Sequence, residues 1–442
     1  MTASSSSEQA PSSEARREAS PSEVAEDDAA MSDAFEQLAR ELGPQFERHA
    51  PLALEGAALE ATLRPRSAEA CAAALGALSR AGVGALITGG GTRLASANAP
   101  CRGRVRLDMT ALREAPELDL DEGVARFSAG TTLAEIEAQL AGSIWQLPLD
   151  PPGEAGTLGG ALASAALGPS FGHPRDVVLG LGIALASGVL VKSGGRVVKN
   201  VTGYDLNKLF VGSNGGLGVI TSAWIRLRPC PERVDVLVAP APQDPALTLA
   251  ASRVFSARAV ALVDAALAPH SCAIAGSARA LVLELAGDDA AVRADRAAFA
   301  AKLGASDAPA GALAELRAAQ GSGAVRFRVA TLPSETAAVR GALCAAGAST
   351  LVYPARGLVY ARFDASASSH ADASAFAAQL AAVASAAQRA GGAWRVEAAP
   401  AALRSGQEML GAHDETLALQ RALKRAYDPQ GILNPGRGFG EA

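Results

Sequence analysis

The chain has 442 residues, 49% of them hydrophobic, which is enough for two or three domains that each bury a core. The formal net charge is −5 and the 40 lysines and arginines form no dense run, so no nucleic-acid partner is expected. The five cysteines lack the spacings of zinc or iron–sulfur ligands, which favours reduced thiols in a cytoplasmic protein.

The first part of the chain, residues 1–30, is mostly Ser, Glu, Ala and Pro and has no hydrophobic run. This composition predicts a disordered tail rather than a signal peptide. Met31 precedes a helical-looking segment and is an alternative start to Met1. From Ala61 the pattern predicts strand, helix, strand, and the alternation over 117–129 predicts a β-hairpin.

The longest apolar stretch runs from Val177 to Val191 and has only 15 residues, which is short for a membrane span. We interpret it as two buried strands. Residues 45–233 are rich in glycine and short strands and are expected to form one domain.

The texture changes after Pro229 and Pro231, where strand patterns alternate with alanine-rich helices. Residues 234–400 are therefore expected to form a second α+β domain with a mixed or antiparallel sheet, as a cap over a substrate or as an interface. The segment 401–442 is expected to pack back on the first domain. The predicted strands are Val234–Val238, Ala259–Val263, Leu281–Leu285, Val325–Val329, Leu351–Tyr353, Leu358–Phe363 and Trp394–Val396.

The first segment that suggests chemistry is GGGTR at Gly89 to Arg93, directly after the predicted strand 85–88. Glycines let consecutive backbone N–H groups turn towards an anion and cradle a phosphate, although the same residues also build ordinary turns. The chain has neither a strict G-x-G-x-x-G nor a G-K-S/T loop, so the two commonest nucleotide cradles are excluded.

A second segment, PPGEAGTLGG at 151–160, leads into a run of small residues. Gly159 and Gly160 allow close approach of the backbone to a flat or anionic group at a helix start, with a plain loop-to-helix junction as the alternative. Further glycine-centred segments lie at 172–180 and 212–221. Ordinary turns do not readily explain four such segments so close together.

The chain resembles the FAD-binding proteins of the vanillyl-alcohol-oxidase and PCMH type in the order of six segments. They are GGGT, PPxxxGTLGG, RDVVLG, KNVTGYDLNKL, GSNGGLGVIT and DPQGILNPGR. Residues 190–221 and 428–437 resemble most closely the FAD-binding subunit of bacterial glycolate oxidase. The resemblance covers residues 61–233 and the last fifteen residues. It implies an α+β fold, with a PCMH-type FAD-binding domain of two subdomains beside the second α+β domain.

The resemblance also implies an FAD site. Backbone N–H groups of 89–93 would hold the pyrophosphate, 157–160 would line the pyrophosphate and ribityl chain, and 218–220 would lie near the adenine, while the terminal motif would close the site. The residues implied are Gly89, Gly90, Gly91, Thr92, Arg93, Thr157, Leu158, Gly159, Gly160, Arg175, Asp176, Gly218, Ile220 and Asn434. For Arg175 and Asp176 an ordinary ion pair is the alternative.

Two departures from the resembling proteins bear on the chemistry. Members with covalent flavin usually carry a histidine in the glycine loop, whereas this chain has Thr92, so the FAD is expected to be non-covalent. Related dehydrogenases use a histidine-rich metal site, but the five histidines here are far apart in the sequence, so no metal site is expected and the catalytic base is unknown.

We interpret the chain as an FAD-binding subunit of a glycolate (2-hydroxy acid) oxidase complex, whose flavin relays electrons. The implied partners are a second flavin subunit and an iron–sulfur subunit. The expected location is the cytoplasm, with attachment to the inner face of the membrane through partner subunits as a further option.

Two other functions remain open. One is a self-sufficient FAD-dependent oxidase of an alcohol or sugar acid, with His173, Tyr204, Lys208 or Arg437 near the flavin. The other is a flavin-free assembly scaffold, against which the glycine loops argue because a scaffold has no need of close backbone approach.

Overall fold

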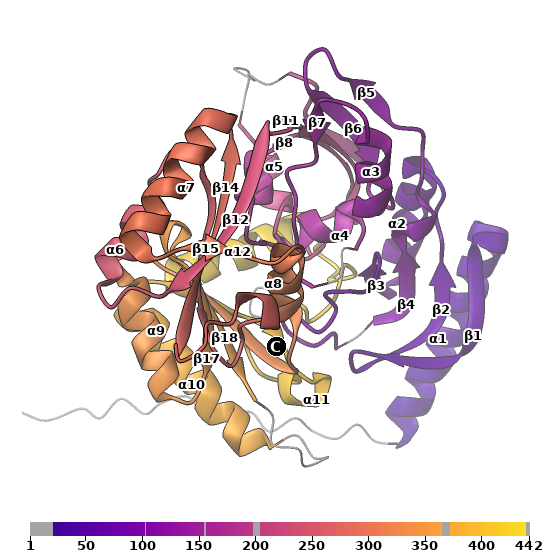
Figure 1. Cartoon of the computed structure of the whole chain (residues 1–442). Coiled ribbons are helices and arrows are strands. Elements are labelled where there is room, and N and C mark those ends of the chain that lie inside the picture. Colours follow the sequence, from indigo (N-terminus) through magenta and orange to yellow (C-terminus); the bar gives the residue numbers. More distant parts are fainter. Residues whose placement is uncertain (1–20, 102, 154–155, 198–203, 365–371, 439–442) are drawn as a thin grey trace, which may run out of the picture.

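The computed structural model describes residues 21–101, 103–153, 156–197, 204–364 and 372–438. Two regions face each other (Figure 1). The glycine-loop region, residues 21–232 with 412–438, contains a four-stranded, a five-stranded and a two-stranded sheet. The nine-stranded region, residues 233–411, contains a single large sheet.

The four-stranded sheet has the order β1-β2-β4-β3, in which β1 and β2 are antiparallel and the other pairs are parallel. Helix α2 (Ala68–Ala81) makes the crossover between β2 and β3; Ser67 caps its start and Gly82, in the left-handed conformation, ends it. The strands are β1 (Phe46–Leu54), β2 (Ala57–Leu63), β3 (Gly84–Thr88) and β4 (Gly103–Asp108). This confirms the strand, helix, strand order predicted from Ala61.

Helix α1 (Pro21–Leu42) packs on α2. It begins inside the segment 1–30 that was expected to be a disordered tail, so that expectation does not hold from Pro21 onwards. Proline is favoured in the first turn of a helix, and the alanines and glutamates that follow are good helix formers. Residues 1–20 lie outside the described residues.

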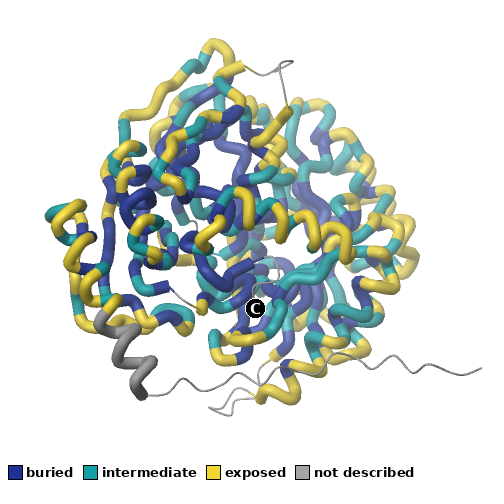
Figure 2. Tube along the Cα trace, turned by 180° about the vertical axis from the view of Figure 1, so that it is seen from behind, coloured by how far each residue is buried: buried dark blue, intermediate teal, exposed yellow. Residues whose placement is uncertain are grey.

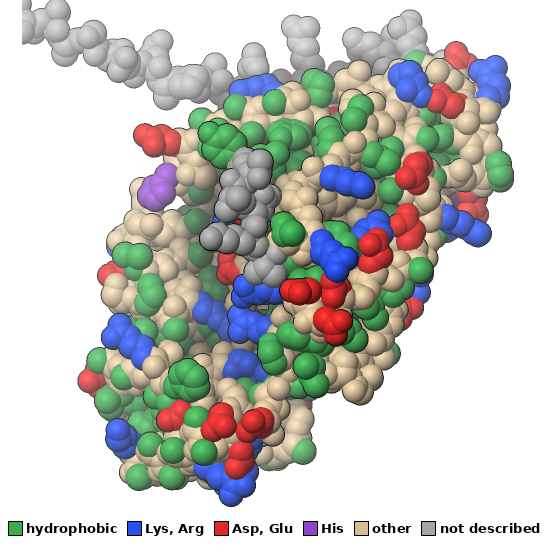
Figure 3. Space-filling model, turned by 90° about the horizontal axis from the view of Figure 1, so that it is seen from above, with side chains coloured by type: hydrophobic (Ala, Val, Ile, Leu, Met, Phe, Trp, Pro, Cys, Tyr) green, Lys and Arg blue, Asp and Glu red, His purple; other side chains and the backbone are tan. Residues whose placement is uncertain are grey.

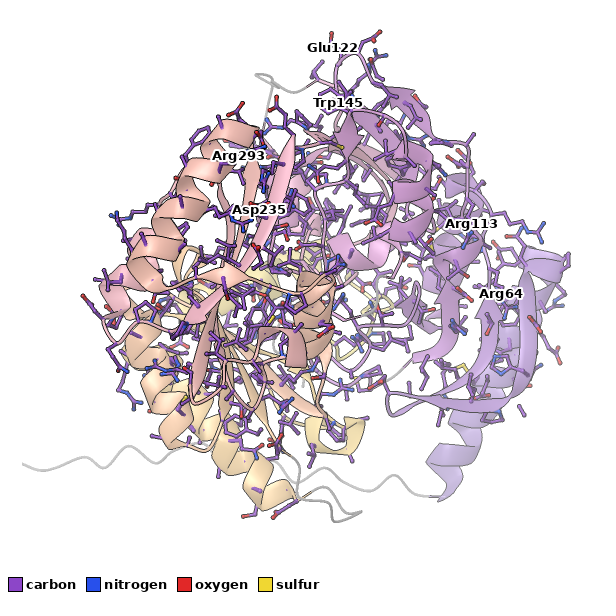
Figure 4. All side chains as sticks on the ribbon, in the orientation of Figure 1. Arg64, Arg113, Glu122, Trp145, Asp235 and Arg293 are labelled. Atoms are coloured by element: carbon purple, nitrogen blue, oxygen red, sulfur yellow. The ribbon has the colours of Figure 1, made fainter. Side chains whose placement is uncertain are left out.

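The five-stranded sheet is antiparallel, with the order β5-β6-β10-β8-β9. The hairpin predicted over 117–129 is confirmed by β5 (Glu117–Asp119) and β6 (Val124–Ser128). Trp145 lies beneath the turn that carries Glu122 (Figure 4), and its indole N–H donates to the carbonyl of Leu120 at 2.7 Å.

The apolar stretch from Val177 forms two strands, but only one of them is buried. Strand β8 (Val178–Ala184) is paired on both sides and mostly buried, whereas β9 (Leu190–Gly194) is an edge strand that is largely exposed. The expectation of two buried strands is therefore wrong for β9, because hydrophobic content does not show which strand ends at a sheet edge. The remaining strand, β10, spans Val219–Arg226.

The nine-stranded sheet has the order β15-β12-β14-β13-β17-β18-β16-β19-β20, and all of its pairs are antiparallel. All seven strands predicted between 234 and 400 are present. They are β12 (Arg233–Pro240), β13 (Ala257–Asp264), β14 (Arg279–Gly287), β16 (Val325–Ala330), β17 (Ser349–Tyr353), β18 (Leu358–Phe363) and β19 (Ala393–Ala398), with short β15 (Ser306–Asp307) and β20 (Leu410–Gly411) at the edges.

Helices cover both faces of this sheet: α8 (Ala312–Gly321) packs through Ala312 and Leu316 on the face that turns towards the glycine-loop region, and larger helices cover the other face. Helices α7 (Asp289–Leu303), α9 (Thr336–Ala345) and α10 (Ala373–Arg389) pack on it from outside, and in Figure 1 they lie away from the glycine-loop region. The strand residues beneath α9 and α10, Phe327, Val329 and Val396 among them, form an apolar core. Figure 2 shows the buried residues inside both regions, with exposed positions on the outer helices.

The end of the chain returns to the four-stranded sheet. After α12 (Asp414–Tyr427), the Ala85 N–H donates to the Ile432 carbonyl at 2.8 Å and the Asn434 N–H donates to the Ala85 carbonyl at 2.9 Å. The buried Lys424 ammonium donates to Asp428 at 2.7 Å and to the Leu433 carbonyl at 2.8 Å. These bonds hold the terminal segment against β3.

Over the described ranges, no helix is both long and apolar enough to cross a membrane.

Candidate functional site

Two adjoining cavities, of about 560 and 430 Å³, lie in the glycine-loop region where β3, helix α4 (Leu158–Ala163) and the terminal segment meet. Both are lined by Gly89, Thr157, Gly160, Asn214 and Asn434. Four segments far apart in the sequence therefore converge on one place.

The loop Gly89–Arg93 forms one wall of the larger cavity. Within the described part of the chain, the backbone N–H groups of Gly90, Gly91 and Thr92 donate to no protein acceptor. Gly91 has a φ of +78°, which turns the backbone in a way that side chains disfavour. A Cβ at Gly90 would come within 3.3 Å of the Gly156 Cα, so the two glycine loops pack directly on each other. The unused donors suit an anion.

The opposite wall is the start of α4. The Thr157 side chain caps this helix by accepting from the Gly160 N–H at 3.3 Å. A Cβ at Gly159 would lie 2.7 Å from the Ala129 Cβ, so only glycine fits there. Thr157, Gly159 and Gly160 line the cavities, whereas Leu158 is fully buried in the apolar core on the other side of the helix. Gly218 and Ile220 line the smaller cavity.

The terminal motif closes the site between the two loops. Asn434 accepts from the Ile87 N–H at 2.7 Å and donates to the Asn214 carbonyl at 2.6 Å. Arg437 is buried and donates to the carbonyls of Leu94 and Ser96 at 2.9 and 3.1 Å, which holds the end of the first glycine loop. Burial lowers the pKa of Arg437 to about 10, so it stays protonated at neutral pH.

Asn214 was not among the residues expected from the sequence. It lines both cavities and a third one next to them, and its φ is +50°. Asn434 also has a positive φ, of +46°. Such strained non-glycine residues cluster at functional sites. The asparagine in the motif GSNGG was the signal in the sequence.

Several expected residues lie away from the cavities. Arg175 and Asp176 are exposed and line neither cavity. The Arg175 Nε lies 4.0 Å from the Asp176 Oδ1, a distance at which the two can form an ordinary ion pair. Tyr204 is 92% exposed, and Lys208 is exposed and pairs with Asp205 at 3.3 Å. The adjacent residues 198–203 of the resembling motif lie outside the described residues.

The nine-stranded sheet turns a charged face towards these cavities. Strands β16 and β19 pair with Arg328 opposite Arg395, and their polar side chains share one face while the alternate residues enter the apolar core. Arg395 donates to the carbonyl of Ser164 at 2.9 Å, and Ser164 lines the larger cavity. Arg328 and Arg395 also line the third cavity, of about 630 Å³.

Four guanidinium groups surround a single carboxylate on this face. Glu397 accepts from Arg395 at 2.7 Å and lies 3.1 Å from the Nε of Arg328, and Arg93 and Arg326 are close enough to interact with it. Burial favours the neutral acid, yet Arg395 and Arg328 hold the pKa of Glu397 at about 2. Burial lowers the pKa of Arg93 to about 10, against the attraction of Glu397. We call this cluster (Arg93, Arg326, Arg328, Arg395 and Glu397) the arginine face; it keeps excess positive charge.

His173 also lies near the arginine face. Burial, with Arg175 and Arg328, lowers the pKa of His173 to about 4, so the ring is neutral at physiological pH. Of the arginine face only Arg93 was expected from the sequence, because Arg326, Arg328, Arg395 and Glu397 lie on strands outside the glycine motifs. The alternating strings VRFRVA and WRVEA mark strands with a charged face, and they were the available signal.

Elsewhere the surface is mixed in charge. Figure 3 shows acidic and basic side chains interspersed on one face of the molecule. Among the described residues, no group of three or more His, Cys, Asp or Glu side chains is placed to hold a metal ion.

Two family models match this chain. An FAD binding domain matches residues 59–194, and the C-terminal domain of FAD linked oxidases matches residues 404–437. These matches confirm the resemblance inferred from the ordered glycine motifs and the FAD cofactor that it implied. The first match contains the loops at 89–93 and 157–160, and the second contains Asn434 and Arg437.

Curated relatives match over part of their length. The chain is 32% identical to glycolate oxidase subunit GlcD of Bacillus subtilis (strain 168), over 41% of this chain and 39% of that protein. It is 34% identical to D-lactate dehydrogenase of Archaeoglobus fulgidus over 45% of each protein, and 42% identical to glycolate oxidase subunit GlcE of Escherichia coli (strain K12) over 28% of this chain and 37% of that one. The matches span less than half the length of these relatives.

Solved structures match over nearly the whole chain. p-Cresol methylhydroxylase with substrate bound aligns with a TM-score of 0.67 and 16% identity, covering 92% of this chain and 96% of that one. Alkyldihydroxyacetonephosphate synthase aligns with a TM-score of 0.64 and 17% identity, covering 91% and 84%. They confirm the α+β fold of the PCMH type.

Proposed function

We propose that this chain, which carries an FAD binding domain and the C-terminal domain of FAD linked oxidases, is a subunit of an FAD-dependent oxidoreductase that acts on a small 2-hydroxy acid. The observation that carries the substrate class is the arginine face, which places several cations beside the cavities of the FAD domain. The names of the relatives, glycolate oxidase and D-lactate dehydrogenase, point to the same class.

The residues of the two cavities fit FAD. In the described part of the chain no protein acceptor takes the backbone N–H groups of Gly90, Gly91 and Thr92, so these groups can donate to the pyrophosphate. Thr157, Gly159 and Gly160 line the smaller cavity at the start of α4. Asn434 and Arg437 would fix the loop from the other side. Thr92 offers no histidine or cysteine for attachment, so we propose that the FAD is held non-covalently.

The arginine face would bind and orient the carboxylate of the substrate. Arg328 and Arg395 form a rigid pair because Glu397 and the carbonyls of Ala165 and Ser164 fix both guanidinium groups. Planar guanidinium groups match a carboxylate well, and cations held in a partly buried site act more strongly than in water. Bound FAD supplies the acceptor for the two electrons that leave the hydroxyl-bearing carbon.

We further propose that the chain works in a glycolate oxidase complex with a second flavin subunit and an iron–sulfur subunit. It matches relatives named as two different glycolate oxidase subunits. A cytoplasmic location, with attachment to the membrane through the partners, goes with this proposal. The segments 234–400 and 401–442 would then act as cap or interface and as closure of the FAD domain.

The first test is the absorption spectrum of the chain expressed alone, followed by anaerobic addition of glycolate and of D-lactate. We expect flavin absorption bands, and we expect acid to release the chromophore from the protein. After glycolate or D-lactate is added, the bands should persist until the partner subunits are also present. Bleaching by the chain alone would instead make it a self-sufficient dehydrogenase. Failure to take up added FAD would favour the flavin-free scaffold.

The second test addresses the arginine face by titrating the flavin spectrum with oxalate, a stable dicarboxylate. Arg395→Gln is expected to weaken oxalate binding at least about tenfold, which corresponds to about 1.4 kcal/mol. The control is Arg293→Gln, an exposed arginine on α7 that should leave the titration unchanged. Equal oxalate affinity in wild type and Arg395→Gln would remove the arginine face from the substrate site.

A further inference from the structure

A further cavity lies in the nine-stranded region, with about 970 Å³ of empty space that is partly open to solvent. It is bounded by helix α6 (Pro245–Ala251), strand β13 and the start of α9. None of its lining residues lines the cavities of the cofactor site. In Figure 1, α6 and α9 lie on the outer side of the molecule, away from α4 and β3. The cavity is therefore separate from the FAD domain.

The walls of this cavity are mostly apolar and rigid. Proline rings and branched side chains form much of the surface, including Pro245, Leu249, Leu262 and Val352. Leu262 and Val352 face each other across the β13–β17 ladder, so that wall is part of the sheet. A surface of this kind favours the hydrocarbon part of a ligand.

Two arginines interrupt the apolar lining. Arg340 of α9 donates to Asp264 at 2.6 Å, and Asp264 is itself fixed by the Thr350 N–H at 2.8 Å and the Thr350 hydroxyl at 2.6 Å. Arg340 is thus held in one orientation. Its Nε is buried and has no hydrogen-bond partner among the described residues, so one donor remains unused.

The second cation is Arg279, at the start of β14. Over the described part of the chain, the Arg279 guanidinium makes no ion pair, whereas Arg340 is neutralised by Asp264. The cavity therefore carries one uncompensated positive charge beside an apolar space. The buried Thr336 adds a hydroxyl to the lining. This combination matches a ligand with one anionic group and an apolar body.

We infer that this cavity is a second binding site, for a carboxylate with an aliphatic chain, in which Arg279 pairs with the carboxylate and the sheet wall covers the chain. Because the cavity shares no residue with the cofactor site, the inference does not rest on the proposed function. A ligand of this class would bind to the nine-stranded region whether or not the flavin is reduced.

The test is isothermal titration of the FAD-loaded full chain with octanoate and, separately, with 1-octanol. We expect one octanoate site per chain and at least tenfold weaker binding of 1-octanol, because the neutral alcohol cannot pair with Arg279. Arg279→Gln should weaken octanoate about tenfold and leave 1-octanol unchanged. The matched control is Arg253→Gln, an exposed arginine beyond α6 that is outside the cavity.

A second variant tests the apolar part without changing the charge. Ala337→Leu places extra carbon atoms in the cavity from α9 and should abolish octanoate binding while the flavin spectrum stays unchanged. The inference is overturned if octanoate does not bind, if 1-octanol binds equally well, or if neither variant changes the affinity. If the chain takes up no FAD but still binds octanoate, the result would count against the proposed function and not against this second site.

Discussion

The two regions of the molecule shape the space between them by different means. The glycine-loop region contributes mainly backbone: N–H groups at Gly90 to Thr92 that meet no acceptor among the described residues, and a helix start whose close contacts leave no room for a Cβ at Gly159. The nine-stranded region contributes side chains, above all Arg328 and Arg395, which reach across to the carbonyls of Ala165 and Ser164. Backbone contacts suit a large cofactor, whereas arginine side chains suit a small anion.

The two regions should therefore respond differently to amino-acid substitution. A backbone cradle depends on small residues and on the segments that hold the loops, so substitutions there should lower both folding stability and FAD binding. An arginine face depends on single guanidinium groups, so substitutions there should affect anion binding while the cradle stays intact. The following predictions separate these outcomes.

The largest effect is expected at the buried Lys424, which ties α12 to the terminal segment. Lys424→Met removes an ammonium that donates to Asp428, to Leu433 and to the Gly216 carbonyl at 3.1 Å. The Asp428 carboxylate would be left buried without its cation, so the free energy of unfolding should fall by about 3–5 kcal/mol. Urea denaturation measures this change.

The matched control is Lys208→Met, at an exposed pair with Asp205, which should change stability by less than about 0.5 kcal/mol. A loss below about 1 kcal/mol in Lys424→Met would mean that the terminal segment is held by other contacts.

The next effect is expected at Gly159. In Gly159→Ala, the added methyl group would lie 2.7 Å from the Ala129 Cβ and 3.1 Å from the Ala129 carbonyl, so the start of α4 must move. Such overpacking costs about 1–3 kcal/mol, and we expect FAD affinity to fall with stability. Flavin content by absorbance and the melting temperature measure both.

Gly341→Ala is the control for this substitution. Gly341 lies within α9, where a Cβ would meet nothing within 4 Å, so alanine should stabilise the chain by about 0.5–1 kcal/mol and leave flavin content unchanged. Retention of full flavin content in Gly159→Ala would contradict the backbone cradle.

The junction between the regions should respond to pH through Asp150. Burial raises the pKa of Asp150 from 3.8 to about 6, against hydrogen bonds from the Ser170 and Phe171 N–H groups and the charge of Arg356. Because the folded pKa lies above the unfolded one, this contribution to stability is complete below pH 3.8 and is lost as the pH rises through 6.

Asp150→Asn removes this titration. Relative to the variant, the wild type should lose on the order of 2 kcal/mol of stability between pH 4 and pH 7, measured by urea denaturation at each pH. A difference between the two proteins that does not change with pH would show that Asp150 titrates normally.

The smallest effect is expected on the outer surface of α7, where Arg293 is labelled in Figure 4. Arg293 pairs with Asp289 one turn earlier at 2.8 Å, and its side chain is 65% exposed. Arg293→Ala should lower stability by less than about 0.5 kcal/mol and leave flavin content unchanged. A change in flavin content would show that the outer helices influence the cavity.

Much of the fold could be predicted because its signals are local. Short strand-like runs between alanine-rich segments indicated the strands of the large sheet, and Ser67 and Gly82 mark the ends of α2. The edge position of β9 was not predictable, because hydrophobic content is the same for a central strand and an edge strand. The expected site residues also differ in where the structure places them. Gly89 to Thr92 line a cavity, whereas Arg175 and Asp176, which are neighbours in the sequence, lie at the surface.

By itself, the sequence determined that this protein has glycine-built loops of the FAD-binding type, since glycine is required wherever the backbone must turn sharply or approach a ligand. It also determined that Arg326 and Arg328 share one strand face, because side chains alternate along a strand. Only the tertiary structure decided that this face meets Ser164 and Ala165 and joins Arg395 and Glu397. That meeting depends on strand register and on packing between segments more than a hundred residues apart, which no local pattern encodes.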